Sequence, residues 1–290
     1  MMQDPAPLMP HWHFFFSALV FVFGACVGSF LNVCIYRIPR ELSVVAPRSF
    51  CPNCRRQIPW YLNIPLFSYT TLGGKCRFCG NRIAARYVLV ELLVAVLFLL
   101  VWLKFDLLTG TTALGLVPLR GGAVIPVYWL VVSGLVLGTF VDFEHLIIPD
   151  RVTLGGIAAG LVLSAILPEL HGAPDVLTSL LRSAVGLAAG WGALWVVGAV
   201  GKLIFKKDAM GFGDVKLLGA IGAFFGWRAV LFNILVSSLL GSLVGLVLVV
   251  AGRKGLQSRI PYGPYIALAA LVWMLWGERL WAIYFNILLR

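Results

Sequence analysis

Hydrophobic residues occur along this chain in long runs that are separated by shorter polar stretches. Eight such runs can be drawn, at residues 14–36, 86–103, 124–144, 152–167, 176–201, 214–227, 229–251 and 263–286. A helix of about 20 apolar residues crosses the hydrocarbon core of a bilayer. The run at 214–227 is short for a full span, so we expect it to be tilted or sheltered by its neighbours. The pattern predicts an all-α polytopic membrane protein with about eight transmembrane helices.

The composition supports this fold class and bears on which kind of partner the protein binds. Of the 290 residues, 60% are hydrophobic and 12% are charged, and a soluble domain of this length could not bury so much apolar surface. The formal charge of +11 raises the question of a nucleic-acid partner. Basic residues in the loops on one side of a membrane fix topology, however, and this explains the charge without nucleic acid. The expected partner is the lipid bilayer.

The N-terminal region and the basic loops predict an orientation. The first apolar run is too long for a signal-peptide core, and no Lys or Arg precedes it, so we expect no cleavable signal and an external N-terminus. Alternating the spans from there makes four loops cytoplasmic: 37–85, the loop at Arg151, the loop from Lys202 to Lys216, and the loop at 253–259. Most of the 23 Lys and Arg residues lie in these loops, as the positive-inside rule requires.

Four of the six cysteines lie in the long loop at 37–85, as two Cys-x-x-Cys motifs: Cys51, Cys54, Cys76 and Cys79. Two such motifs 21 residues apart are typical of a tetrathiolate zinc site, because each turn directs two sulfurs at one ion. The alternative is a pair of disulfides or redox motifs, which a cytoplasmic location disfavours. We expect a zinc-knuckle loop between the first and second spans, with a structural ion, because four thiolates leave no open position.

Two aspartates stand at the membrane boundary without an obvious structural explanation. Asp142 ends the third span, and Asp214 follows Gly211 and Gly213 at the start of the sixth. A carboxylate at such a boundary is costly and marks a candidate functional site. Either orientation of the chain places both on one side of the membrane. The alternative for Asp214 is an ordinary helix N-cap, and Asp150 has that explanation too, since it begins the fourth helix after Pro149.

A pair of carboxylates in a low-dielectric site can share a proton and activate water. One would act as general base, and the other, protonated, would donate to the carbonyl that is cleaved. Because the N-terminus of a helix favours an ionised carboxylate, we expect Asp214 to be the base and Asp142 the acid. The residues thus predict an intramembrane aspartic peptidase with three parts: the first span (1–36), the zinc loop (37–85) and a transmembrane peptidase domain (86–290).

Polar residues inside the first two spans have a simpler interpretation. Gly28 permits close approach of another helix, and Asn32 is placed to hydrogen-bond across that contact. Glu91 lies one or two turns inside the second span, where it pairs with the loop or faces an internal polar pocket. We expect all three to be structural.

The order and spacing of these motifs resemble those of the bacterial type IV prepilin peptidases, which are bifunctional leader peptidases and N-methyltransferases. The resemblance runs almost from end to end. It rests on the segments 28–33, 63–69, 73–76, 86–93, 142–150, 211–217 and 261–265, together with both cysteine motifs. The resemblance implies a multi-pass protein of the bacterial inner membrane with its active site on the cytoplasmic side.

The resemblance also implies a reaction. Asp142 and Asp214 would cleave a prepilin or pseudopilin after a glycine, removing a short basic leader. The new N-terminal amine would be methylated from S-adenosylmethionine, and the family associates this step with the zinc loop, where Gly74 and Lys75 are candidate cofactor-binding residues. One departure is Leu62, since the family usually has an acid there. We therefore expect methyl transfer to use another acid, either Glu41 or Glu91.

Three alternatives remain open at this stage. The protein could be a peptidase alone, with a zinc loop that is only structural. It could be a peptidase of the wider Gly-x-Gly-Asp group with a different substrate. It could also be a membrane scaffold or proton-coupled transporter, because an acid pair in a membrane fits a proton path as well as a protease.

Overall fold

A computed structural model of the chain describes residues 11–105, 123–206, 210–252 and 260–288. The N-terminal ten residues, and the basic residues Lys207, Arg253, Lys254 and Arg259 that entered the topology prediction, lie outside the described residues. The chain divides into two compact units, one ending at Ile125 and the other beginning at Pro126. The division into three functional parts stays a prediction.

The first unit is a helix pair with a long loop between its members. It contains α1 (His11–Arg37), η1 (Ile38–Arg40), η2 (Trp60–Leu62), α2 (Phe67–Thr71) and α3 (Arg86–Phe105). Within the ranges described, the loop shows β-structure only as two isolated bridges, Phe50 with Gln57 and Lys75 with Arg82.

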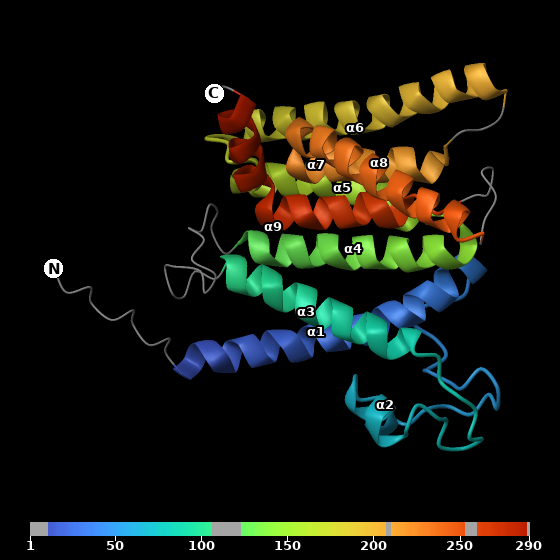
Figure 1. The fold of residues 1–290 in the computed structure, drawn as a ribbon. Helices are drawn as coiled ribbons and strands as arrows, with labels where there is room; N and C mark the ends of the chain where they lie inside the picture. Colours follow the sequence, from blue (N-terminus) through green and yellow to red (C-terminus); the bar gives the residue numbers. More distant parts are fainter. Residues whose placement is uncertain (1–10, 106–122, 207–209, 253–259, 289–290) are drawn as a thin grey trace. The chain divides into compact units, whose positions relative to one another are not determined.

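The second unit is a helical bundle. It is formed by α4 (Val124–His145), α5 (Asp150–Ile166), η3 (Pro168–His171), α6 (Val176–Phe205), α7 (Phe212–Phe225), α8 (Trp227–Val250) and α9 (Gly263–Leu288). In Figure 1, the C-terminal turns of α9 bend away from the rest of that helix.

Each of the eight predicted runs coincides with one of these helices, so the predicted fold class is confirmed. Six of them, α1, α3, α4, α6, α8 and α9, are long and apolar enough to cross a membrane. With 17 and 14 residues, α5 and α7 are shorter. Nearly every residue of α7 from Asp214 to Phe224 is buried. Neighbouring helices therefore shelter this short helix, as its length suggested.

Small residues allow α1 and α3 to cross closely (Figure 1). A Cβ placed on Gly24 would lie 2.8 Å from the Cα of Ala95, and one on Gly28 would lie 2.7 Å from the Cα of Glu91. One turn further along, the Nδ2 of Asn32 donates to the carbonyl oxygen of Tyr87 at 2.9 Å. The predicted structural roles of Gly28 and Asn32 are thus confirmed. In lipid there is no hydrophobic attraction between helices, so close backbone packing and interhelical hydrogen bonds stabilise the pair.

Glycines also bring α6 against α7. A Cβ on Gly186 would lie 2.1 Å from the carbonyl oxygen of Gly222, and one on Gly190 would lie 2.3 Å from that of Leu218. Helix α5 also packs against α7, with Gly156 facing Ala220 and Gly160 facing Ala223. Since both contact positions advance in the same direction, α5 and α7 run parallel, and their N-termini lie at the same end of the unit.

Candidate functional site

Asp142 lies in the last turn of α4, where its side chain is only 5% exposed. The helix ends shortly afterwards, because Leu146 adopts a left-handed conformation (φ 55°) and its N–H bonds back to the carbonyl oxygen of Asp142. The Oδ2 atom of Asp142 accepts a buried hydrogen bond of 3.0 Å from the backbone N–H of Gly263, the first residue of α9. One carboxylate oxygen is therefore held by the start of a helix 121 residues away.

Asp214 lies in the first turn of α7 and is 9% exposed. The N-cap of this helix is Gly211, so the interpretation of Asp214 as an ordinary N-cap is wrong. The carboxylate folds back over Gly211, because a Cβ on that residue would lie 3.1 Å from the Oδ2 of Asp214. A side chain at position 211 would crowd this carboxylate, so Gly211 leaves room for it, whereas its φ of −69° is one that any residue adopts.

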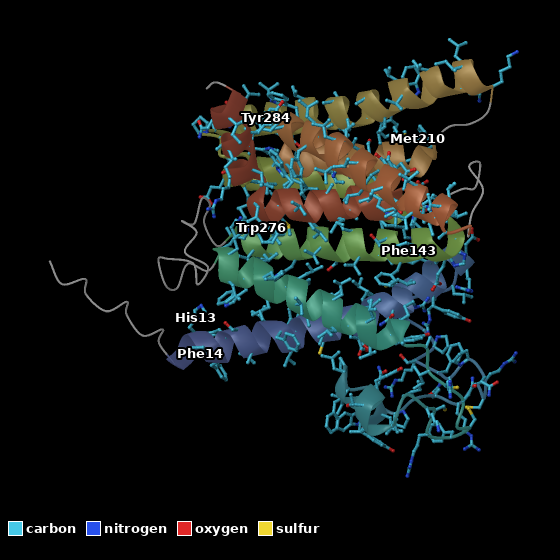
Figure 2. All side chains as sticks on the ribbon, viewed as in Figure 1. His13, Phe14, Phe143, Met210, Trp276 and Tyr284 are labelled. Atoms are coloured by element: carbon cyan, nitrogen blue, oxygen red, sulfur yellow. The ribbon has the colours of Figure 1, made fainter. Side chains whose placement is uncertain are left out.

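Ile148 brings the surroundings of the two aspartates together. A Cβ on Gly213 would lie 3.2 Å from the Cβ of Ile148, and one on Gly263 would lie 3.0 Å from its Cδ1. The carboxylates of Asp142 and Asp214 are close enough to interact electrostatically. The two aspartates singled out in the sequence thus lie in one buried site. Figure 2 labels Phe143, next to Asp142, and Met210, just before α7, which mark this end of the second unit.

Asp150 does not cap helix α5 as the sequence suggested. Although α5 begins at this residue, its N-cap is Pro149 and no side chain caps the helix. Instead, the carboxylate of Asp150, which is largely exposed, accepts a hydrogen bond from the Nζ of Lys216 and forms an ion pair with it. Lys216 also lies over the ring of Phe212, with its Nζ 5.1 Å from the ring centroid. The pair connects the N-terminal parts of α5 and α7 and leaves Asp142 and Asp214 as the buried acids at this end.

Two neighbouring carboxylates in a buried site can carry out acid–base chemistry on a water molecule. Like charges in a low dielectric repel strongly, so such a pair tends to hold one proton between its members. The ionised member can take a proton from water and the protonated member can donate one. The sequence predicts Asp214 as the base because a helix N-terminus favours an ionised carboxylate. In the structure both residues meet a helix N-terminus, since Asp142 contacts the first residue of α9 and Asp214 lies in the first turn of α7. Proximity to a helix N-terminus therefore does not distinguish the base from the acid.

The four loop cysteines form a cluster that could hold a metal ion. Their sulfur atoms all lie within 4.8 Å of one another, and those of Cys51 and Cys79 are 3.9 Å apart. A tetrahedral zinc site with Zn–S bonds of about 2.3 Å requires sulfur–sulfur distances of about 3.8 Å. The donor set and its spacing therefore fit a tetrathiolate zinc ion.

The two Cys-x-x-Cys motifs share one backbone geometry. In the first, the N–H of Cys51 donates to the carbonyl oxygen of Arg56, and the N–H of Arg55 donates to that of Cys51. In the second, the N–H of Cys76 donates to Asn81 and that of Gly80 donates to Cys76, in the same way. The residue after each second cysteine is left-handed, with φ of 58° at Arg55 and 69° at Gly80. The repeated turn directs each pair of sulfurs toward the common centre.

Local hydrogen bonds prepare one of these sulfurs for a metal. The backbone N–H of Asn81, together with the side chain of Asn53, lowers the pKa of Cys79 to about 6. These hydrogen bonds favour the thiolate form of Cys79, which is the form that binds zinc.

The residues proposed for a methyl donor lie in the turn between α2 and the second cysteine motif. Gly73 and Gly74 are both left-handed, with φ of 57° and 65°. The N–H of Gly74 donates to Tyr69, its carbonyl oxygen accepts from Ile83, and a Cβ there would lie 3.1 Å from the Tyr69 ring. Gly74 is buried and its peptide groups are occupied, whereas Lys75 is exposed. Of the two, Lys75 has the side chain that can reach an anionic ligand.

Gly263 and Ile148 were not identified from the sequence as residues of the aspartate site. The segment 261–265 entered only as part of a resemblance, and Ile148 looks like any apolar residue in a boundary segment. The glycine itself, beside Tyr262 and before a proline, is the signal that could have indicated a close backbone approach.

Comparisons with known proteins agree with this geometry. Residues 22–105 match the Bacterial Peptidase A24 N-terminal domain, and residues 129–246 match the Type IV leader peptidase family. Relatives named "Prepilin leader peptidase/N-methyltransferase" include one from Aeromonas hydrophila, 35% identical over 92% of this chain and 92% of that protein. Another, from Pseudomonas aeruginosa, is 32% identical over 93% of each.

A third relative of the same name, from Myxococcus xanthus, is 39% identical over 83% of this chain and 65% of its own length. No solved structure matches. Because the Aeromonas and Pseudomonas relatives are covered over nearly their whole length, the chain belongs to the type IV leader peptidase family.

Proposed function

We propose that this protein is a membrane aspartic endopeptidase that removes the short basic leader of type IV prepilins or pseudopilins after a glycine. Asp142 and Asp214 are the catalytic pair, one as general base on water and the other as general acid on the scissile carbonyl. The observation that carries the proposal is the meeting of these two buried carboxylates around Ile148, in a chain whose family is named for leader peptidases.

The same protein is proposed to methylate the new N-terminal amine, as the names of its relatives indicate for those proteins. S-adenosylmethionine, when bound, would supply an electrophilic methyl group to this amine. The chain's own contribution is the loop of the first unit, where Lys75 would hold an anionic part of the donor and the turn at Gly74 would position it. Zinc at Cys51, Cys54, Cys76 and Cys79 would hold that loop in shape.

The acid that the family usually places at position 62 is replaced here by Leu62, on η2. We propose that Glu91 takes its place. Its carboxylate is buried and accepts the N–H of Leu66, four residues after Leu62. The other candidate, Glu41, is exposed at the end of η1, and within the described part of the loop it makes no such hydrogen bond to the 62–66 segment.

The proposed location rests on topology. Six helices of suitable length and composition support a multi-pass membrane protein, and the basic residues of the loops favour a cytoplasmic position for Asp142 and Asp214; the membrane we propose is the bacterial inner membrane. A prepilin leader is basic and cytoplasmic before cleavage, so the site and the scissile bond would meet at that face.

The test is a cleavage assay in liposomes. A prepilin is incubated with the wild type, Asp142→Asn, Asp214→Asn and the control Asp175→Asn, and product masses are read with and without S-adenosylmethionine. We expect both site variants to lose cleavage and the control to keep it, because Asn is as good an N-cap as Asp. The wild-type product should gain one methyl mass when the donor is present.

Each other outcome identifies one of the alternatives. Cleavage without the methyl mass would leave a peptidase with a structural zinc loop. Cleavage retained in Asp142→Asn would contradict the catalytic pair. A wild type that cleaves none of several prepilins would favour a scaffold, a transporter or a different substrate.

A further inference from the structure

The N-terminus of α9 directly contacts the carboxylate of Asp142. The backbone N–H of Gly263 is the donor to Asp142, and this bond is buried. A Cβ on Gly263 would lie 2.8 Å from the Oδ2 of Asp142 and 3.4 Å from its Cγ. Real Cβ atoms essentially never approach an atom so closely, so any larger residue here would displace the carboxylate or the helix start.

The backbone conformation does not explain this glycine. Gly263 is absent from the residues with positive φ in the described ranges, so its φ and ψ are open to alanine, and alanine is the better helix former. What requires glycine is the carboxylate beside it. The requirement therefore concerns the position of Asp142 and does not arise from the local fold of α9.

A second set of contacts fixes α9 at this point. On α8, two polar residues four positions apart are buried: Asn233, at 0% exposure, and Ser237, at 1%. The Nδ2 of Asn233 donates to the carbonyl oxygen of Ile266 at 2.9 Å. The Oγ of Ser237 and the hydroxyl of Tyr262 are hydrogen-bonded at 2.7 Å. These bonds lie on either side of Gly263 along the chain, so α8 holds the segment that carries the N–H.

We propose that the start of α9 is a third component of the aspartate site, in which the N–H of Gly263 positions the carboxylate of Asp142 and α8 holds that N–H through Tyr262 and Asn233. Gly263 is a positioning residue: it fixes Oδ2 and leaves the other oxygen of Asp142 for water or substrate. This inference rests on the proposed peptidase function. It extends the site from the two boundary aspartates to a segment that follows the matched family region, 129–246.

The decisive variant is Gly263→Ala in the full-length protein, assayed in liposomes with a prepilin. We expect kcat to fall about 100-fold, as a misplacement of about 1 Å can cause, while KM stays within about threefold because the substrate-binding surface is unchanged. The melting temperature in detergent should stay near that of the wild type. The matched control is Gly155→Ala on α5, where a Cβ meets nothing within 4 Å, and it should behave as the wild type.

A rescue variant separates positioning from packing. Of the three atoms nearest to a Cβ at position 263, the one outside Asp142 is the Cδ1 of Ile148, at 3.0 Å, and Ile148→Val removes this atom. If Asp142 is the affected group, the double variant Gly263→Ala with Ile148→Val stays slow. Recovery to wild-type activity in the double variant, or activity of Gly263→Ala within threefold of the wild type, would overturn the proposal.

A second variant decides the question if Gly263→Ala does not fold. Tyr262→Phe removes only the hydroxyl that bonds Ser237 and Ser238. Tyr265→Phe removes a hydroxyl from the same turn that makes no hydrogen bond to the described residues. We expect Tyr262→Phe to lower kcat about tenfold and Tyr265→Phe to leave it unchanged; equal activity of both would overturn the proposal. Failure of the proposed function is distinguishable, because the wild type and Gly155→Ala would then show no cleavage either.

Discussion

The carboxylate of Glu91, inside α3, accepts the backbone N–H of Leu66 at 2.8 Å. Leu66 is the N-cap of the short helix α2 and has a φ of 63°, a conformation that costs a non-glycine residue on the order of 1–3 kcal/mol. A buried acid of a membrane-spanning helix thus holds a strained residue of the loop. Glu91 was expected to be structural, and this contact supports that expectation for the anchoring of the loop.

The first prediction separates this anchor from the chemistry proposed for the same side chain. Glu91→Gln keeps an oxygen that can accept the N–H of Leu66 but removes the charge. We expect it to lower the methylation of cleaved pilin about 100-fold, as loss of a stabilising charge at a reacting group can do, while leader cleavage stays normal. Mass spectrometry of the pilin product measures both steps.

Glu91→Ala and Glu41→Gln are the matching variants. The alanine variant should lose the anchor as well as methylation, and limited proteolysis would then cut the segment 62–66 faster than in the wild type. Glu41→Gln should methylate normally, because Glu41 is exposed. If Glu91→Gln methylates like the wild type, Glu91 is an anchor only and the acid for methyl transfer lies elsewhere.

Much of the fold could be predicted from apolar runs, because a membrane requires every spanning segment to be both apolar and helical. The predicted run at 124–144 corresponds to α4 (Val124–His145), and the run at 229–251 to α8 (Trp227–Val250). The boundary positions of Asp142 and Asp214 follow from the same pattern. Their meeting does not, because periodicity gives no information about which helices pack together.

Contacts between segments that lie far apart in the chain could not be predicted from the sequence. The bond from Gly263 to Asp142 spans 121 residues and uses a backbone N–H, which every residue except proline possesses. Asp150 was interpreted as a cap because caps are local, yet its partner, Lys216, is 66 residues away. The zinc cluster was more predictable, since the two Cys-x-x-Cys turns are local and their shared ligand has a fixed chemistry.

The second prediction concerns the contact between α6 and α7. Gly186→Ala places a Cβ 2.1 Å from a backbone oxygen, and a backbone cannot move aside as a flexible side chain can. We expect a loss of about 3 kcal/mol in the free energy of unfolding, at the upper end of the cost of overpacking. Gly192→Ala on the same helix meets nothing within 4 Å and should be neutral or slightly stabilising, because alanine is the better helix former. Unfolding in mixed micelles measures the difference, and equal losses in both variants would contradict the glycine contact.

The third prediction concerns the metal. Purified protein should contain about one zinc ion per chain, and Cys54→Ser or Cys79→Ser should lower this content, because each removes a thiolate of the cluster. Cys26→Ser, an exposed cysteine of α1, should leave it unchanged. Elemental analysis measures the ion, and the cleavage assay should show that zinc-depleted protein still removes the leader within about threefold of the wild-type rate. Loss of leader cleavage together with zinc would show that the peptidase depends on the loop.

The fourth prediction concerns the pH dependence of a helix cap. Asp175 caps α6: its carboxylate accepts the backbone N–H of Thr178 at 2.8 Å and the hydroxyl of the same residue at 2.7 Å. These bonds hold the pKa of Asp175 below its usual value. A lowered pKa means that the stabilisation is fully present above the unfolded value of about 3.9 and is lost as the pH falls through the lower, folded value.

Asp175→Ala should therefore lower the melting temperature at pH 7, and its deficit relative to the wild type should shrink toward pH 3. Asp175→Asn provides the control, because its amide oxygen can accept the capping bond from the backbone N–H of Thr178 without titrating. Its advantage over the alanine variant should persist at both pH values, even as other carboxylates titrate in all three proteins. A wild-type advantage over alanine that is equal at pH 7 and pH 3 would mean that protonation of Asp175 does not weaken the cap.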